Sequence, residues 1–172
     1  MKKIMLTSML LATLIGRSAG QAVIADPAVN VMRTASTTSL PVNPTLIPLD
    51  SVITLRVPVI NYNQVNALPS GSCKIKIGLG SKIMLDPAFD LATVNTSNYF
   101  SWTAQSSGGQ VQITGDLIAS LPANFLDTVI FQIKSSVLGN STITTNFLVT
   151  NHNTNTFLSD ENGANNNAFI SY

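Results

Sequence analysis

The sequence predicts an all-β protein: an immunoglobulin-like antiparallel β-sandwich of about seven to nine strands, preceded by a signal peptide. Two observations predict this fold class. Short runs rich in β-branched residues recur between turn signals, about every 8–12 residues. Beyond the first 20 residues, no long window shows the 3.6-residue period of a helix. The length of 172 residues suits one domain with its own core.

The composition excludes several classes of function. Hydrophobic residues make up 45% of the chain and charged residues only 10%, where a globular protein averages about 25% charged. A chain with this much apolar content is not expected to be intrinsically disordered. The formal net charge is +1 and no basic cluster occurs, so nucleic-acid binding is not expected. Asn, Thr, Ser and Gln must therefore supply the polar surface.

Residues 1–20 have the pattern of a secretory signal peptide. Lys2 and Lys3 form a cationic start, and residues 4–15 are a 12-residue apolar run. A membrane-spanning helix needs about 20 residues, so the run indicates export and not an anchor. Small residues follow up to Gly20, after which we expect cleavage, with Ala22 and Ala25 as alternative sites. The protein is therefore expected outside the cytoplasm: extracellular, at the cell surface or in the periplasm.

Cleavage would make the chain acidic. Removing Lys2, Lys3 and Arg17 from nine basic residues leaves six against eight acidic residues, a net charge of about −2. Polybasic attraction to lipid is then lost, and no membrane insertion is expected after cleavage. Cys73 is the only cysteine, so no internal disulfide can form, and its alternating surroundings predict a buried thiol.

The mature chain divides into a leader and a sandwich. Residues 21–44 are rich in Ala, Thr, Ser and Pro and are predicted to be a leader or edge segment, with a possible strand at 29–32. Residues 45–172 are predicted to form the sandwich. Its first strand, 52–59, contains Pro58, which has no N–H for a ladder and favours an edge, a bulge or a strand end.

The remaining strands follow in order from period-two alternation. Residues 73–79 place Lys74 and Lys76 on one face, and residues 127–134 place Val129, Phe131 and Ile133 together. Residues 86–92 allow one helical turn at most. The other predicted strands are 83–85, 99–103, 110–114, 142–150 and 168–172.

Residues 160–165 are the one metal-site candidate. Asp160, Glu161 and Asn165 offer the carboxylate and amide oxygens that calcium prefers, although their spacing is not that of an EF-hand. The favoured interpretation is a turn in which Asp and Asn bond their own backbone. No other cofactor is predicted. The asparagine-rich stretch 151–167 is either a solvated loop or a surface that hydrogen-bonds sugars.

Groups for catalysis are sparse, and no enzyme activity is predicted. His152 is the only histidine and Glu161 the only glutamate, so neither a zinc site nor a facing pair of glutamates can form. Asp86 precedes a proline and is expected to cap a turn. Trp102 is either a core residue, which we favour, or an exposed platform for a sugar ring.

The second half, 99–172, resembles the immunoglobulin-like repeat modules of bacterial secreted and surface proteins, of the conserved-repeat adhesin and CARDB-like types. The likeness rests on the aromatic stretch 101–103, the Leu-Pro turn at 121–124, the strand 142–150 and the acidic, asparagine-rich run 159–168. Residues 61–63 read Asn-Tyr-Asn, where such modules have Asn, any residue, then Gly.

The resemblance implies a function. Modules of this type serve as spacers, adhesin stalks and assembly units, which predicts a non-enzymatic module for surface structure, adhesion or assembly. Its partner would be a protein at the cell surface or another repeat module. The alternative is a small carbohydrate-binding module with a polysaccharide ligand.

Overall fold

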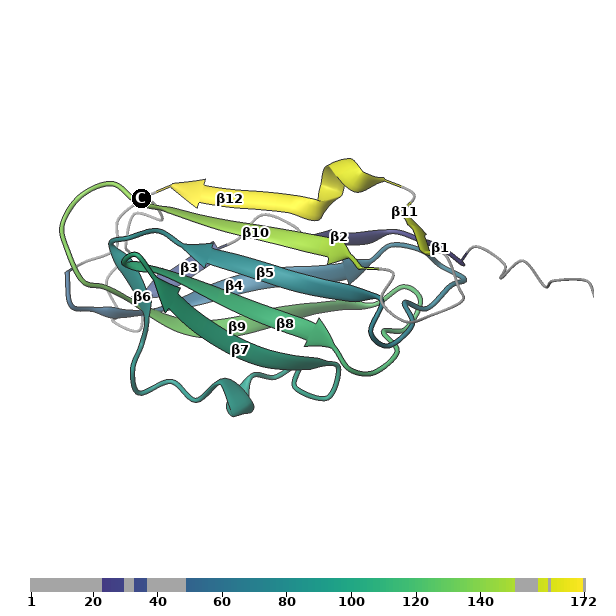
Figure 1. Ribbon diagram of the computed structural model, residues 1–172, viewed down its shortest axis with the longest axis horizontal. Coiled ribbons are helices and arrows are strands. Elements are labelled where there is room, and N and C mark those ends of the chain that lie inside the picture. Colours follow the sequence, from purple (N-terminus) through teal and green to yellow (C-terminus); the bar gives the residue numbers. More distant parts are fainter. Residues whose placement is uncertain (1–22, 30–32, 37–48, 151–157, 161, 172) are drawn as a thin grey trace, which may run out of the picture.

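Twelve strands and two short 3-10 helices make up the described part of the chain (Figure 1). The computed structural model describes residues 23–29, 33–36, 49–150, 158–160 and 162–171. The elements are β1 (Val23–Ala25), β2 (Pro27–Val29), β3 (Arg33–Ser36), β4 (Val52–Asn61), β5 (Cys73–Leu79), β6 (Ile83–Leu85), η1 (Leu91–Thr93), β7 (Phe100–Ser107), β8 (Gln110–Leu117), β9 (Leu126–Ser135), β10 (Thr142–Val149), β11 (Leu158–Asp160), η2 (Gly163–Asn166) and β12 (Asn167–Ser171).

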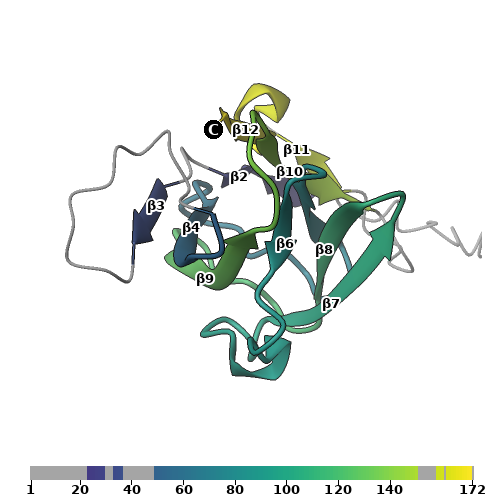
Figure 2. The ribbon, with the colours of Figure 1, turned by 90° about the vertical axis from the view of Figure 1, so that its left-hand side faces the viewer.

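The strands form two facing sheets. The front sheet has the order β12-β10-β5-β8-β7, and the back sheet has the order β2-β4-β9-β6, with β3 also pairing with β4. Every pairing within these two sheets is antiparallel, whereas β1 and β11 form a separate parallel pair. Figure 2 shows β3, β4 and β9 on one side and β10, β8 and β7 on the other. The predicted antiparallel sandwich is confirmed.

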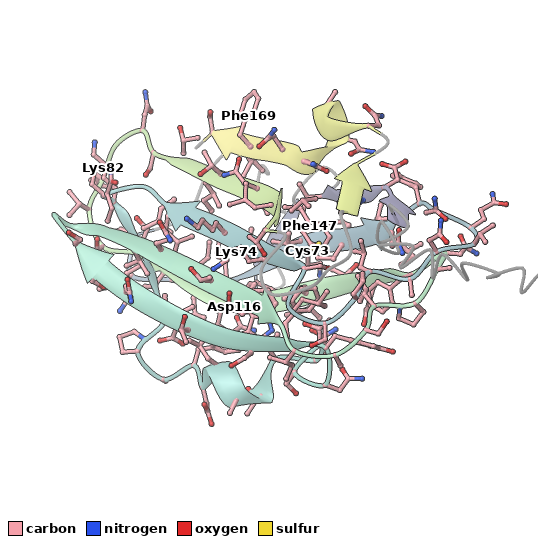
Figure 3. The ribbon with its side chains drawn as sticks, turned by 45° about the vertical axis from the view of Figure 1, so that its right-hand side comes forward. Cys73, Lys74, Lys82, Asp116, Phe147 and Phe169 are labelled. Atoms are coloured by element: carbon pink, nitrogen blue, oxygen red, sulfur yellow. The ribbon has the colours of Figure 1, made fainter. Side chains whose placement is uncertain are left out.

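Alternation along the strands divides the side chains between core and solvent. In β5, Cys73 and Ile77 are buried, while Lys74 lies on the outer face with its Nζ 3.0 Å from Oδ1 of Asp116 in β8 (Figure 3). In β9 the predicted inward residues include Phe131, which is fully buried. Burial of one face is what makes a period-two pattern reliable, because a shift of one residue would expose the whole apolar set.

Trp102 of β7 lies in the core. Its side chain is 9% exposed, and its ring centroid is 5.1 Å from that of Phe131 and 5.5 Å from that of Phe100. The Phe131 ring meets it edge-on at 81°, a favourable aromatic geometry. The core interpretation is confirmed, and the ring offers no platform to a sugar.

Gly115 of β8 makes room for this ring. It stands opposite Trp102 in the β7–β8 ladder, and a Cβ there would lie 2.6 Å from Cη2 and 2.7 Å from Cε3 of the indole. We expect Gly115→Ala to reduce the free energy of unfolding by about 1–3 kcal/mol through overpacking, as measured by urea denaturation. In a Trp102→Leu background the loss should shrink. An equal loss in both backgrounds would contradict steric contact as the cause.

Pro58 lies inside β4, so the predicted strand end is wrong, but the predicted edge position holds locally, because among the described residues Pro58 pairs only with Thr128 of β9. The strand continues to Asn61 and has partners on both sides. On the side away from β9, β3 pairs with residues 53–56 and β2 with residues 59–61. The gap between these two partners falls at residues 57–58, where the proline has no N–H to offer.

Short strands occupy the amino-terminal segment. Of the strand predicted at 29–32, Val29 ends β2 and residues 30–32 lie outside the described part, so that strand stays a prediction; β3 follows. Pro27, Ala28 and Val29 are all buried, because β2 also contacts β10, β12 and η2 of the other half of the molecule. The β2 strand thus closes one side of the sandwich.

A buried asparagine fixes the loops that follow β4. Asn61 is fully buried, and its Nδ2 donates to the carbonyl oxygens of Asn66 and Pro122, both at 3.0 Å. Its Oδ1 accepts from the Asn63 amide at 3.3 Å. Among the described residues only Asp50 and Asn124 have positive φ outside glycine, so Asn63 does not use the conformation that a glycine would favour there. Side-chain hydrogen bonds shape this turn instead.

Candidate interaction surface

One of the three residues of the predicted calcium site lies outside the described part of the chain. Glu161 is among the residues not described, as is His152. Asp160 closes β11, where its backbone pairs with Ala25, and Asn165 lies in η2. The Nδ2 of Asn165 donates to Oδ1 of Asp26 at 2.8 Å. Among the described residues no three His, Cys, Asp or Glu side chains gather in a metal-binding group, and calcium at 160–165 stays a prediction.

Asp86 and Asp90 cap local structure. Oδ1 of Asp86 accepts from the Ala88 amide at 3.2 Å, which confirms the predicted turn cap. Oδ1 of Asp90 accepts from the Ala92 amide at 2.9 Å and caps η1. Each carboxylate is engaged with its own backbone, as is usual for Asp at a turn or cap. Cys73 is buried, as expected.

The strand β12 ends the front sheet. It pairs along its length with β10, from Asn167 opposite Asn146 to Ser171 opposite Thr142, and no described strand pairs with its other edge. The strand reads Asn-Ala-Phe-Ile-Ser and has neither a charge nor a proline. Natural sheets usually protect an open edge with such residues, so an unprotected one is typical of a pairing site.

An exposed phenylalanine stands on this edge. Phe169 is 74% exposed, and Figure 3 shows its ring standing out from β12. A groove of about 380 Å³ lies between β12 and β2. Its lining is mostly apolar, with two asparagines, and consists of Ala28, Val29, the half-exposed Tyr62, Asn165, Asn167, Ala168 and Phe169. An open edge beside an apolar groove offers backbone groups and a place for side chains together.

Asp26 joins the two walls of the groove. Its carbonyl oxygen accepts from the Tyr62 amide at 2.9 Å, next to the end of β4. Its carboxylate accepts from Asn165 of η2, which leads directly into β12. The residue between β1 and β2 is therefore hydrogen-bonded to both the back-sheet side and the front-sheet side. The groove is held in shape before any ligand arrives.

Phe169 does not stand out in the sequence. The aromatic residues there gather in 99–102, and residues 168–172 are predicted only as the closing strand. The missed signal is the alternation within β12, where Ala168 and Ile170 are half-buried and Phe169 lies between them. Period two then puts Phe169 on the solvent side.

Comparisons with known proteins support the fold. No family model matches the chain, and no curated protein matches it. Among solved structures, the major pilin SpaA of Corynebacterium diphtheriae, from a modular pilus assembly with stabilizing isopeptide bonds, matches with a TM-score of 0.50 and 10% identity. The match covers 84% of this chain and 38% of the pilin, so the chain spans well under half of that protein.

Two further structures match at lower similarity. A non-cellulosomal cohesin from the hyperthermophilic archaeon Archaeoglobus fulgidus has a TM-score of 0.39 and 11% identity. The match covers 87% of this chain and 88% of the cohesin. AvmM, which catalyzes macrocyclization in alchivemycin A biosynthesis, has a TM-score of 0.37 and 12% identity, with 87% and 86% covered.

The fold defines the class of the protein. Two antiparallel sheets around one core, together with the likeness to the pilin, identify an immunoglobulin-like β-sandwich. At 10% identity the likeness extends to the fold alone. In the part of the chain that the structure describes, no helix has the length and apolar character needed to cross a membrane.

Proposed function

We propose that the chain is an exported, non-enzymatic module of a surface or extracellular protein assembly, and that it binds its partner through the open edge of β12. The observation that carries this proposal is the uncharged edge with Phe169 beside the groove. An extended segment of the partner would add a strand to β12 and place alternate side chains in the groove. Adhesion is one use of such a contact.

Export rests on the sequence of residues 1–20, which lie outside the described part. The n-region, apolar run and small residues support a cleaved signal peptide. The single, buried cysteine fits a fold that needs no disulfide in an oxidising compartment. The proposed localisation is therefore the periplasm, the cell surface or the medium.

The other edge of the front sheet is less suited to a partner. β7 is also uncharged, but its exposed positions from Thr103 to Ser107 are small or polar, and the groove lies at the β12 side. An aromatic side chain adds far more contact area to an interface than Ser or Thr. The difference makes β7 a matched control for β12.

Photo-cross-linking tests the proposed function. With p-benzoylphenylalanine in place of Phe169, we expect one protein from the surface fraction of the source organism to be attached, whereas the same group in place of Gln105 in β7 attaches none. Hydrogen exchange of the β12 amides should slow in the presence of that protein, because a strand partner protects them.

The variant Phe169→Lys tests whether binding of the partner is lost when the β12 edge carries a charge. A charge on an open edge opposes strand pairing, so this variant should lose the partner without a change in melting temperature, since the ring is exposed. Equal cross-linking from positions 169 and 105, or no protein adduct at 169, would contradict the proposed function.

A further inference from the structure

A second recess lies on the outer face of the front sheet, where β5 ends and β10 begins. This shallow cleft has a volume of about 370 Å³, within the range of small-ligand sites. Residues 78–81 form one wall, the segment 140–144 forms another, and Gln110 at the start of β8 borders it. The cleft is separate from the groove between β2 and β12.

The lining of the cleft is neutral and polar. Gln110 and Asn140 contribute carboxamides, while Ser81, Ser141 and Thr144 contribute hydroxyl groups. Each of these groups both donates and accepts hydrogen bonds. No charged side chain lines the cleft, and the Lys74–Asp116 pair is not part of it. A lining of this kind complements a ligand that itself carries many hydroxyl groups and no charge.

Hydrogen bonds and close packing build the cleft in advance. The Gly80 amide donates to the Thr142 carbonyl at 3.0 Å, and the Gly80 carbonyl accepts from Ile83 at 2.9 Å. A Cβ at Gly80 would overlap Oγ of Ser141 and lie 2.9 Å from the Thr142 oxygen. Only a glycine lets these two walls approach so closely. Preorganisation of this kind lowers the entropic cost of binding.

An aromatic ring stands beside the cleft. Phe169 pairs with Thr144 across the β10–β12 ladder, and Thr144 in turn pairs with Gly78 of β5. Directly opposed residues lie on the same face of the sheet. The exposed Phe169 ring therefore stands on the strand next to Thr144, whose hydroxyl group lines the cleft. Sugar rings have an apolar face of C–H groups as well as hydroxyl groups. The Phe169 ring matches the apolar face, and the polar side chains of the cleft match the hydroxyl groups.

We propose that this cleft binds a neutral saccharide, a ligand class distinct from the protein partner of β12. The hydroxyl groups of the sugar exchange hydrogen bonds with Gln110, Asn140 and the serine and threonine side chains. The shallow, open shape admits part of an oligosaccharide from the side. The lining itself holds no cation to pair with an acidic sugar, and the side chain of Lys82, which follows Ser81, packs against Gly139.

A glycan array followed by NMR titration tests the assignment. We expect the wild-type protein to retain neutral oligosaccharides and not acidic ones. Titration with the best neutral glycan should shift the amide signals of residues 78–81 and 140–144. Gln110→Ala and Asn140→Ala should each weaken binding about fivefold, the effect of one lost hydrogen bond. Both positions are exposed, so the variants should keep the wild-type melting temperature.

Gln105→Ala is the matched control, because Gln105 is an exposed glutamine of the same sheet outside the cleft. It should bind the glycan like the wild type. No retained neutral glycan, signal shifts confined to other regions, or equal weakening in Gln105→Ala would each overturn the proposal. Neither cleft variant touches β12, so each should still cross-link from position 169, and failure of that cross-link alone would contradict only the proposed protein contact.

Discussion

Replacing Trp102 by alanine is expected to reduce the free energy of unfolding by about 3–5 kcal/mol, the cost of removing a large buried aromatic ring. The ring contacts Phe131 from the opposite sheet and Phe100 from its own strand, so the loss would open a cavity between the sheets. Gly115, which cannot fill the space, lies directly beneath it. Urea denaturation monitored by circular dichroism measures the effect.

Two variants make the Trp102 experiment specific. Trp102→Phe should cost less than half as much, because it keeps an aromatic ring and removes the indole Nε1, which is buried without a hydrogen-bond partner. Thr103→Ala changes the next residue, whose side chain is exposed, and should stay within about 0.5 kcal/mol of the wild type. If Trp102→Ala unfolds like Thr103→Ala, the indole is not a core group.

Asn61→Ala is expected to reduce the free energy of unfolding by about 2–4 kcal/mol. The carboxamide is fully buried, and its loss leaves the carbonyl oxygens of Asn66 and Pro122 without their donor. Each unsatisfied buried group costs about 1–3 kcal/mol. Because Asn61 joins two loops that are far apart in the sequence, the same change should increase amide exchange in residues 62–66 and 121–124.

Asn95→Ala is the control for Asn61→Ala. Asn95 also donates its Nδ2 to a backbone carbonyl, that of Thr128 at 2.8 Å, but this bond is exposed to water. Its removal should cost well under 1 kcal/mol, because water replaces the lost partner. Equal losses in the two variants would show that burial does not set the importance of Asn61.

The sandwich could be predicted because burial of one face leaves a local signal. In β5 the apolar residues alternate along the strand, in β9 the buried Val129, Phe131 and Ile133 are spaced by two, and the predicted and observed bounds agree closely. β7 extends to Ser107, four residues beyond its predicted end at 103. All its residues from Thr103 onward are exposed, so backbone pairing with β8 extends the strand without any apolar pattern.

The candidate surfaces could not be predicted in the same way, because they depend on strand order. The sequence shows no sign that β12 is the outermost strand of its sheet, nor that β2 lies across a groove from it. The cleft likewise combines residues 78–81, Gln110 and residues 140–144, which meet only because β5 pairs with both β10 and β8. Long-range pairing of this kind is invisible to local periodicity.

The parallel pair β1–β11 joins two segments that lie far apart in the sequence. Val23 must find Leu158, and β4 must find β9 before the core can close. Such distant pairings make folding slow, on the order of milliseconds to seconds for all-β domains, because loop closure precedes any stabilising contact. The β1 strand can pair with β11 only after residues 158–160 have been synthesised. Under the proposed export, in which the chain crosses the membrane in an extended state, the pairing of β1 with β11 waits until residues 158–160 have crossed.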